Sequence, residues 1–287
     1  MSYIIGVDGG GTGCRVAVAN SAGAVLGRAE GGAANIATDF DFARANILQT
    51  VASAFENAGL PQAEIGAATA VLGIAGANLG DFNARLLASL PFAKTRVISD
   101  AETTLVGAMG EVDGVIGAIG TGSVFGRREH GVFTQIGGWG FLLGDDGSGA
   151  RLGRDILHLT ILASDGLLPH SPLTRAIIDE FEGSPLNLVD RAQAYTPKEF
   201  GQFAPRIVAA ANDSDEHAES ILMRHTEIVR KSIDAAGFDE AKSFCMLGGL
   251  GKVFLKRLPP RYQKAASTPL GNALDGAVTL ALSFSKL

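Results

Sequence analysis

The first group of residues that could do chemistry is Asp8-Gly9-Gly10-Gly11-Thr12-Gly13, directly after a short apolar run. Glycine has no Cβ, so the backbone N–H groups of such a turn can approach an anion closely. A P-loop would end in Gly-Lys-Ser/Thr, and a Rossmann turn would be followed by a helix. Residues 14–20 instead alternate as a strand does. The sequence therefore predicts a glycine hairpin, either beside an anion or without a ligand.

A second glycine turn, Gly120-Thr121-Gly122-Ser123, repeats the first in altered form. Each turn stands between two strand-like runs, and each is followed by a Gly-Gly pair, at 31–32 and at 137–138. The shared order of elements predicts a duplicated domain. Two hydroxyls beside glycines also suit a phosphate, although this turn alone is a weak signal.

Acidic residues at two places in the chain could act on a substrate. Asp100 stands between the predicted strand 95–99 and a predicted helix, where it could cap the helix or act as a general base at the carboxyl edge of a parallel sheet. The segment 137–148 holds the only tryptophan, Trp139, together with Asp145 and Asp146. A ring beside carboxylates suits a sugar site, and a buried tryptophan with an acidic helix cap is the alternative.

Composition limits the class of protein. The chain has 287 residues, 46% of them apolar and 19% charged, which predicts two folded domains rather than disorder. A net charge of −6 disfavours a nucleic-acid partner. No signal peptide or membrane span is evident, and Cys14 and Cys245 resemble buried thiols of a reducing compartment, so we expect a cytoplasmic protein without a membrane partner. The five histidines have no metal-ligand spacing, and His217 and His225 are predicted on a solvated helix.

The hydrophobic pattern predicts alternating strands and helices. The predicted strands are 3–8, 14–20, 24–29, 68–74, 95–99, 114–119, 123–129, 132–136, 243–247 and 262–266. The predicted helices are 40–58, 80–90, 101–109, 148–164, 172–182, 186–194, 203–212, 214–236 and 271–285. The strand 243–247 ends in Gly248-Gly249, which could pass beneath a flat base or form a plain turn.

Taken in order, these motifs resemble the N-acetylglucosamine kinase branch of the BadF/BadG/BcrA/BcrD-type ATPase family, within the sugar kinase, actin and heat-shock ATPase superfamily. The resemblance runs from Ile4 to the closing helix. It implies an α/β fold of two ribonuclease-H-like domains, duplicated βββαβαβα units around an ATP and sugar cleft. We expect an N-terminal domain at 1–112 and a C-terminal domain with a helical insertion at 113–287, and the closing helix 271–287 could pack on the former.

The resemblance also implies roles for individual residues. It implies Asp100 as the catalytic base and Asp8 facing Mg²⁺ through water. The residues implied in phosphate binding are Gly11, Thr12, Gly13, Thr121, Gly122 and Ser123. Those implied at the nucleoside are Gly248 and Gly249. Those implied at the sugar are Asn35, Asp100, Gly138, Trp139, Gly140 and Asp145.

The implied reaction is ATP-dependent phosphorylation of N-acetylglucosamine to its 6-phosphate. Val124, where the family often has Asn, and the aliphatic Phe141-Leu142-Leu143 leave glucosamine or a muramic-acid-type sugar open. An ATPase activator of a reductive dehydratase would need a cysteine cluster for iron–sulfur binding, and a sugar sensor without catalysis would lack Asp100. The resemblance leaves a homodimer open.

Overall fold

The structure, a computed structural model, describes residues 3–287 and divides into two compact units. The first unit comprises the chain up to Asp113 together with Arg128–Phe133 and Thr268–Leu287. The second comprises Gly114–Arg127 and Thr134–Ser267. The end of the chain thus belongs to the first unit, as does the tip of a hairpin at 128–133.

The first unit is built on a five-stranded sheet in the order β3-β2-β1-β4-β5. Its strands are β1 (Ile4–Gly9), β2 (Cys14–Ala19), β3 (Val25–Gly31), β4 (Thr69–Ile74) and β5 (Lys94–Ser99). Strand β1 pairs antiparallel with β2 and parallel with β4, which in turn pairs parallel with β5. Every residue of β4 is buried, as expected of a central parallel strand covered on both faces.

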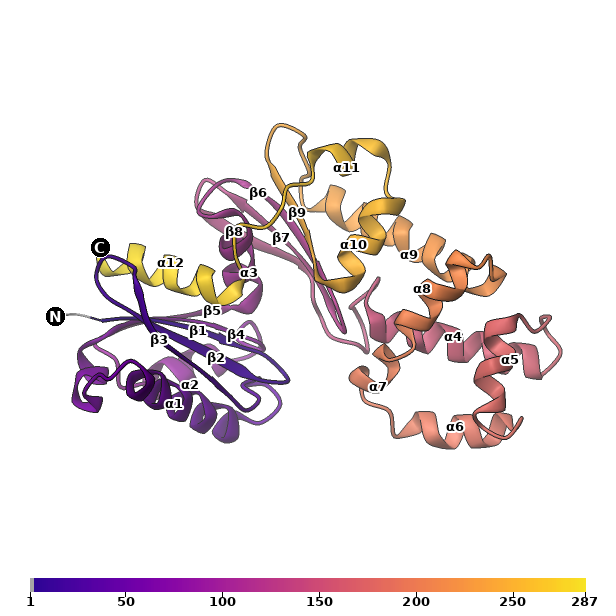
Figure 1. Cartoon of the computed structure of the whole chain (residues 1–287), viewed down its shortest axis with the longest axis horizontal. Coiled ribbons are helices and arrows are strands. Elements are labelled where there is room, and N and C mark those ends of the chain that lie inside the picture. Colours follow the sequence, from indigo (N-terminus) through magenta and orange to yellow (C-terminus); the bar gives the residue numbers. More distant parts are fainter. Residues whose placement is uncertain (1–2) are drawn as a thin grey trace. The chain divides into compact units, whose positions relative to one another are not determined.

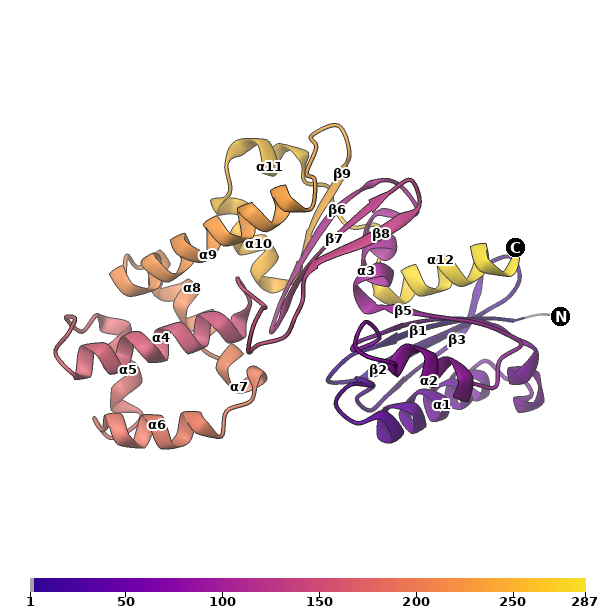
Figure 2. The ribbon, with the colours of Figure 1, turned by 180° about the vertical axis from the view of Figure 1, so that it is seen from behind.

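Helices cover both faces of this sheet. Figures 1 and 2 show α1 and α2 on one face and α12 with α3 on the other. Their bounds are α1 (Phe40–Asn57), α2 (Phe82–Ser89), α3 (Asp100–Met109) and α12 (Ala273–Ser285), and a 3₁₀ turn, η1, spans Gln62–Ala67. Helix α12 packs most closely on α3, where a Cβ at Gly107 would lie 1.9 Å from the carbonyl oxygen of Asn272. The closing helix therefore completes the core of the first unit.

The second unit has a four-stranded sheet in the order β8-β7-β6-β9, with β6 parallel to β9. Its strands are β6 (Gly114–Ile119), β7 (Ser123–Glu129), β8 (Val132–Gly137) and β9 (Ser243–Leu247). Its helices are α4 (Gly149–Ser164), α5 (Pro172–Asp179), α6 (Pro185–Gln193), α7 (Pro197–Gly201), α8 (Ala204–Asn212), α9 (Glu216–Ala235), α10 (Gly248–Arg257) and α11 (Pro260–Ala265). The run α4–α9 lies between β8 and β9 in sequence, and Figure 2 shows it as one group of helices.

The two units repeat the order of three strands, a helical segment and a further strand, which confirms the predicted α/β class. The predicted strand at 262–266 is wrong, because these residues lie largely in α11 and only a single bridge joins Phe244 to Ala266. Pro260 begins this helix, and the fully buried Tyr262 donates its hydroxyl to Asp234 Oδ1 at 2.6 Å. Within residues 3–287, the second sheet therefore has four strands where the first has five.

The helix predicted at 214–236 is present, but the prediction that its histidines are solvated is wrong. His217 is 8% exposed and His225 is 2% exposed. Among residues 3–287, no helix combines the length and the apolar character needed to cross a bilayer.

Candidate functional site

The first glycine turn connects β1 and β2 as a hairpin. The amide of Gly10 donates to the carbonyl of Gly13 at 2.9 Å, while Gly11 and Thr12 are exposed. Strand register places Asp8 directly opposite Arg15, and Arg15 Nε donates to Asp8 Oδ2 at 3.0 Å. The predicted hairpin is therefore present, and its strand-end carboxylate is paired with a guanidinium.

Asp100 lies at the same edge of the sheet as Asp8. The parallel register aligns Gly9 with Ile74 and Ile74 with Ser99, so β1, β4 and β5 end together. Asp100 is the first residue of α3, but the cap is Ser99, whose side chain accepts from the amide of Ala101 at 3.1 Å. The capping role that the sequence offered for Asp100 thus belongs to its neighbour.

The electrostatics of Asp100 differ from those of an ordinary surface carboxylate. Burial raises the pKa of the Asp100 carboxyl above its usual value, and the negative charge of Asp8 adds to that rise. Hydrogen bonds from the amide of Ala101 and the hydroxyl of Ser99 oppose it without cancelling it. A half-buried carboxyl with a raised pKa at a sheet edge is a candidate general base.

Asn35 also reaches the carboxyl edge of the first sheet. It follows β3 in the loop before α1, and its Oδ1 accepts from the amide of Ala37 at 3.0 Å. The same oxygen would lie 2.8 Å from a Cβ at Gly76, just after β4. The first unit therefore brings Asp8 at the end of β1, Asn35 beside the end of β4 and Asp100 after β5 to one edge of the sheet.

The second glycine turn is tied to the start of α4. The amides of Gly149 and Ala150 donate to the carbonyls of Gly120 and Thr121 at 2.8 and 3.1 Å. Ser123 donates its hydroxyl to the carbonyl of Asp146 at 2.7 Å. These bonds fix a turn of small residues against the start of α4, and they engage the first two amides of that helix.

The tryptophan segment folds back onto that turn. A Cβ at Gly122 would lie 2.9 Å from Asp145 Oδ2, and Asp145 has a left-handed backbone with φ 58°. Burial raises the pKa of the Asp145 carboxyl, partly offset by hydrogen bonds from the amides of Gly140 and Ser123. Trp139 is 64% exposed, so the alternative of a buried tryptophan is wrong.

Gly138, the remaining residue predicted to bind sugar, has φ 70°. It packs against Val124, which stands where the family often has Asn. A Cβ there would lie 2.9 Å from Val124 Cγ2. Val124 therefore touches the backbone that leads into Trp139. An Asn at 124 would place a polar group at this point, beside the backbone of the tryptophan segment.

A pocket of about 430 Å³ adjoins the second glycine turn. Gly120 and Thr121 form one part of its wall, α8 adds apolar side chains, and α10 adds Gly249 and its neighbours. The residues that line it are Gly120, Thr121, Gly149, Gly201, Ala204, Pro205, Val208, Gly249, Leu250 and Val253. A largely apolar pocket beside an exposed glycine turn offers one kind of surface for a base and another for phosphates, as a nucleotide needs.

The paired glycines after β9 differ in what they do. A Cβ at Gly248 would lie 2.2 Å from the carbonyl oxygen of Ile119, and its φ is 79°. Gly248 thus lets α10 begin against the end of β6. A Cβ at Gly249 would meet nothing within 4 Å, and this residue lines the pocket. The α8 contribution was missed by sequence reasoning, because Ala204, Pro205 and Val208 carry no motif.

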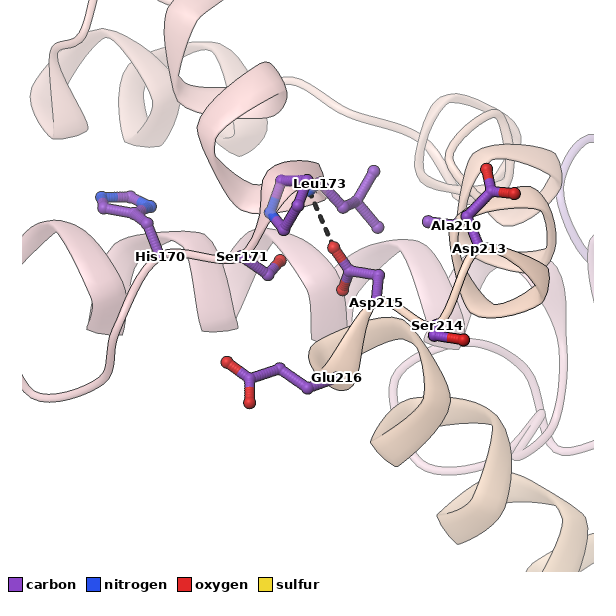
Figure 3. A pocket seen from close by; sticks show the side chains of 9 residues that line it. His170, Ser171, Leu173, Ala210, Asp213, Ser214, Asp215 and Glu216 are labelled. Atoms are coloured by element: carbon purple, nitrogen blue, oxygen red, sulfur yellow. Dashed lines mark hydrogen bonds between the residues drawn. The ribbon is translucent and has the colours of Figure 1, made fainter.

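A second pocket, of about 370 Å³, lies between α5, α8 and α9 (Figure 3). Its central carboxylate, Asp215, caps α9 by accepting from the amides of His217 and Ala218, and it also accepts from Leu173 at 2.9 Å. Figure 3 shows this last bond joining the first turns of α5 and α9. These contacts account for Asp215 as a structural residue, so this pocket is not assigned to the reaction.

The chain matches the model of the BadF/BadG/BcrA/BcrD ATPase family over residues 5–278. It belongs to this family. A glucosamine kinase of Vibrio cholerae is 29% identical over 98% of this chain and 96% of its own length. A Chromobacterium violaceum structure, provisionally assigned as an N-acetylglucosamine kinase, is 35% identical with a TM-score of 0.88, covering 98% of this chain and 99% of that one.

Two further comparisons add range. An N-acetylmuramic acid/N-acetylglucosamine kinase of Clostridium acetobutylicum is 31% identical over 58% of this chain and 55% of its own. A ROK family glucokinase of Streptomyces griseus has a TM-score of 0.54 at 16% identity, over 98% of both chains. That likeness shows the fold alone, namely two ribonuclease-H-like units.

Proposed function

We propose that this chain is a kinase that transfers the γ-phosphoryl group of ATP to a hydroxyl of an amino sugar. The observation that carries the proposal is the apolar pocket whose wall continues into the Gly120–Thr121 turn, since a nucleotide needs an apolar base site joined to a phosphate site. Membership of an ATPase family supports ATP as the donor. The kinase names of the relatives support an amino sugar as the acceptor.

In this proposal the adenosine occupies the pocket beside Gly249, with α10 on one side and α8 on the other. Gly248 acts by placing the start of α10 there. Phosphate-contacting roles are assigned to the turn Gly11–Gly13 of the first unit and to the turn Thr121–Ser123 of the second. Exposed backbone at both turns supplies N–H groups that stabilise negative charge as the γ-phosphoryl group moves.

The sugar is held by hydrogen bonds and by one aromatic face. The Asp145 carboxylate would accept from sugar hydroxyls, and the Asn35 amide would accept from and donate to them. Trp139 would stack on the ring, and Gly138 and Gly140 would let the backbone approach closely. Asp100 accepts the proton of the attacking hydroxyl. The new bond joins that hydroxyl oxygen to the γ-phosphorus, the bond to the β-phosphate oxygen breaks, and ADP leaves.

Magnesium would be held by Asp8 through water. Mg²⁺ usually keeps several waters and takes one or two carboxylates together with the substrate phosphates, so an all-protein cage is not needed. Asp8 fits this demand, because it stands at the end of β1 beside the first glycine turn and Arg15 engages its Oδ2, so that Oδ1 could accept from a water ligand of the ion. Bound there, the ion would neutralise charge on the phosphates. Asp8 itself would orient its water ligands.

N-acetylglucosamine is the acceptor that we propose, giving the 6-phosphate. Glucosamine is the second candidate, because the Vibrio cholerae glucosamine kinase matches nearly the whole chain. The test is a coupled assay of ADP release over N-acetylglucosamine, glucosamine, N-acetylmuramic acid and glucose. We expect the highest kcat/KM with N-acetylglucosamine, and sugar-independent ADP release across the panel would refute the kinase proposal.

Two finer points belong to the same proposal. An activator of a reductive dehydratase would hold an iron–sulfur cluster through several cysteines, whereas Cys14 and Cys245 are the only cysteines and both are buried. A colourless purified protein is the expected result. We also propose a cytoplasmic enzyme, with a homodimer as its possible assembly, which light scattering of the purified chain would test.

A further inference from the structure

We infer that His225 is a positioning residue for the sugar-binding loop, which it holds through the amide of Gly147. This inference rests on the proposed function for its kinetic readout. His225 lies on α9, in the helical segment between β8 and β9. It belongs to no motif of the sequence, and the proposed reaction gives it no role. Its ring is 2% exposed, and both of its nitrogens have defined partners.

The first contact fixes the loop. The amide of Gly147 donates to His225 Nδ1 at 3.0 Å. Gly147 has φ 85°, and a Cβ there would lie 2.7 Å from Val229, one turn further along α9. The backbone at Gly147 therefore packs closely against α9, and its N–H donates to the imidazole. A buried amide without that acceptor would be left unpaired.

The second contact fixes the ring. His225 Nε2 lies 2.7 Å from Asp155 Oδ2 on α4, and Arg224 pairs with the same carboxylate. Because Nδ1 must accept from Gly147, the ring carries its proton on Nε2 and donates it to Asp155. The pKa of Asp155 lies below its usual value, since the bond from His225 and the charge of Arg224 outweigh the effect of burial. The other charged group acting on Asp155 is Arg151 of α4.

The loop held in this way contains the residues proposed to bind sugar and to support the phosphate turn. Asp145 lies two residues before Gly147, and Asp146 accepts the hydroxyl of Ser123 at 2.7 Å. The amide of Ser148 donates to the carbonyl of Asp145 at 3.0 Å. The phosphate turn also has its own bonds from Gly149 and Ala150, so losing the histidine should affect the sugar residues more than the nucleotide residues.

Two substitutions separate the two bonds of the ring. His225→Asn places an amide oxygen where Nδ1 stands, so the acceptor for Gly147 is kept. His225→Gln places a donor where Nε2 stands, so the bond to Asp155 is kept and the acceptor is lost. His217→Gln is the matched control, because that histidine is also buried on α9 but bonds to the carbonyl of Pro169.

We expect His225→Gln to raise the sugar KM about tenfold, which is the size of effect that one unpaired buried amide causes. The ATP KM should stay within about threefold of the wild-type value. His225→Asn and His217→Gln should leave the sugar KM within about threefold of the wild type. Equal sugar KM values for His225→Asn and His225→Gln would overturn the inference, because a merely structural role would move both alike.

Two further readouts need no sugar and so stand apart from the proposed activity. Amide exchange of residues 144–150 in the substrate-free chain should be about tenfold faster in His225→Gln than in the other two variants. In the wild type, nitrogen NMR should find Nδ1 of His225 without a proton and Nε2 with one. Unchanged exchange, or a proton on Nδ1, would overturn the inference even if no amino sugar were phosphorylated.

Discussion

Replacing Asp100 with Asn tests the proposed base at a single atom. The amide has the shape of the carboxylate but cannot accept the proton of an attacking hydroxyl. The local backbone should persist, since Ser99 still caps α3 and Thr104 still donates to the Asp100 carbonyl at 2.7 Å. Base catalysis is worth about 10²–10⁴ in rate, so kcat should fall by that factor, equivalent to about 2.7–5.5 kcal/mol. The sugar KM should change little.

Stability should move in the opposite direction to activity. Burial raises the folded-state pKa of Asp100, so the folded chain binds this proton more tightly than the unfolded chain does. Above that pKa the buried charge costs stability, and the cost disappears as pH falls through it. We therefore expect Asp100→Asn to have a higher Tm than wild type at pH 7.5, with the difference shrinking toward pH 4 in scanning calorimetry.

Glu102 provides the matched control for this experiment. It lies in the first turn of the same helix, burial raises its pKa as well, and it accepts from Arg96 at 3.0 Å. In a coupled ADP-release assay, Glu102→Gln should keep kcat within about threefold, because it removes a surface-edge ion pair rather than the base. Near-normal turnover in Asp100→Asn, or an equal loss in Glu102→Gln, would refute the assignment of the base.

Three other outcomes follow from the same structure. Gly249→Val should raise the ATP KM about tenfold by filling the pocket while the sugar KM is unchanged, whereas Gly248→Ala should lower Tm because its φ and the carbonyl of Ile119 exclude a Cβ. Asp215→Ala should lower the free energy of unfolding in urea by about 2 kcal/mol and leave kcat unchanged. Although burial acts to raise the pKa of Asp215, hydrogen bonds from the amides of Leu173 and Ala218 hold it below its usual value. The contribution of Asp215 to stability is therefore present at neutral pH and lost as pH falls through that lowered pKa. Cys14, whose pKa burial raises to about 12, and Cys245, whose pKa burial also raises, should resist iodoacetamide at pH 7.5 until the chain is unfolded.

Local patterns were sufficient for the sheets but not for every helix. Strands such as 114–119 are continuous apolar runs bounded by glycine turns, so sequence alone places them to within a residue or two. Residues 262–266 were wrongly predicted as a strand, because a tyrosine and two alanines are compatible with both a strand and a helix. Pro260 was the signal for a helix start, and the burial of Tyr262 against Asp234 decided the outcome.

The same limit explains the histidines and the pocket. Glu216, Glu219 and Arg224 made α9 look solvated, yet positions 217, 221, 225 and 229 recur at helical spacing and form its buried face. That spacing was readable in advance. The contribution of α8 to the pocket was not readable, because small apolar residues far from any motif acquire a role only when the chain folds them beside Thr121.

The edge of the first sheet shows why two similar carboxylates can take different roles in the proposed reaction. Asp8 faces the guanidinium of Arg15 across the hairpin, so its negative charge is partly balanced in place. For Asp100, burial raises the pKa and the charge of Asp8 raises it further, so both favour the protonated form. An acid whose pKa is raised by burial and by a neighbouring charge is suited to accepting a proton, whereas an acid paired with a guanidinium is suited to holding its charge. Exchanging the environments would therefore exchange the roles, and Arg15→Met should shift the acid limb of kcat/KM to higher pH by leaving the charge of Asp8 unbalanced beside Asp100.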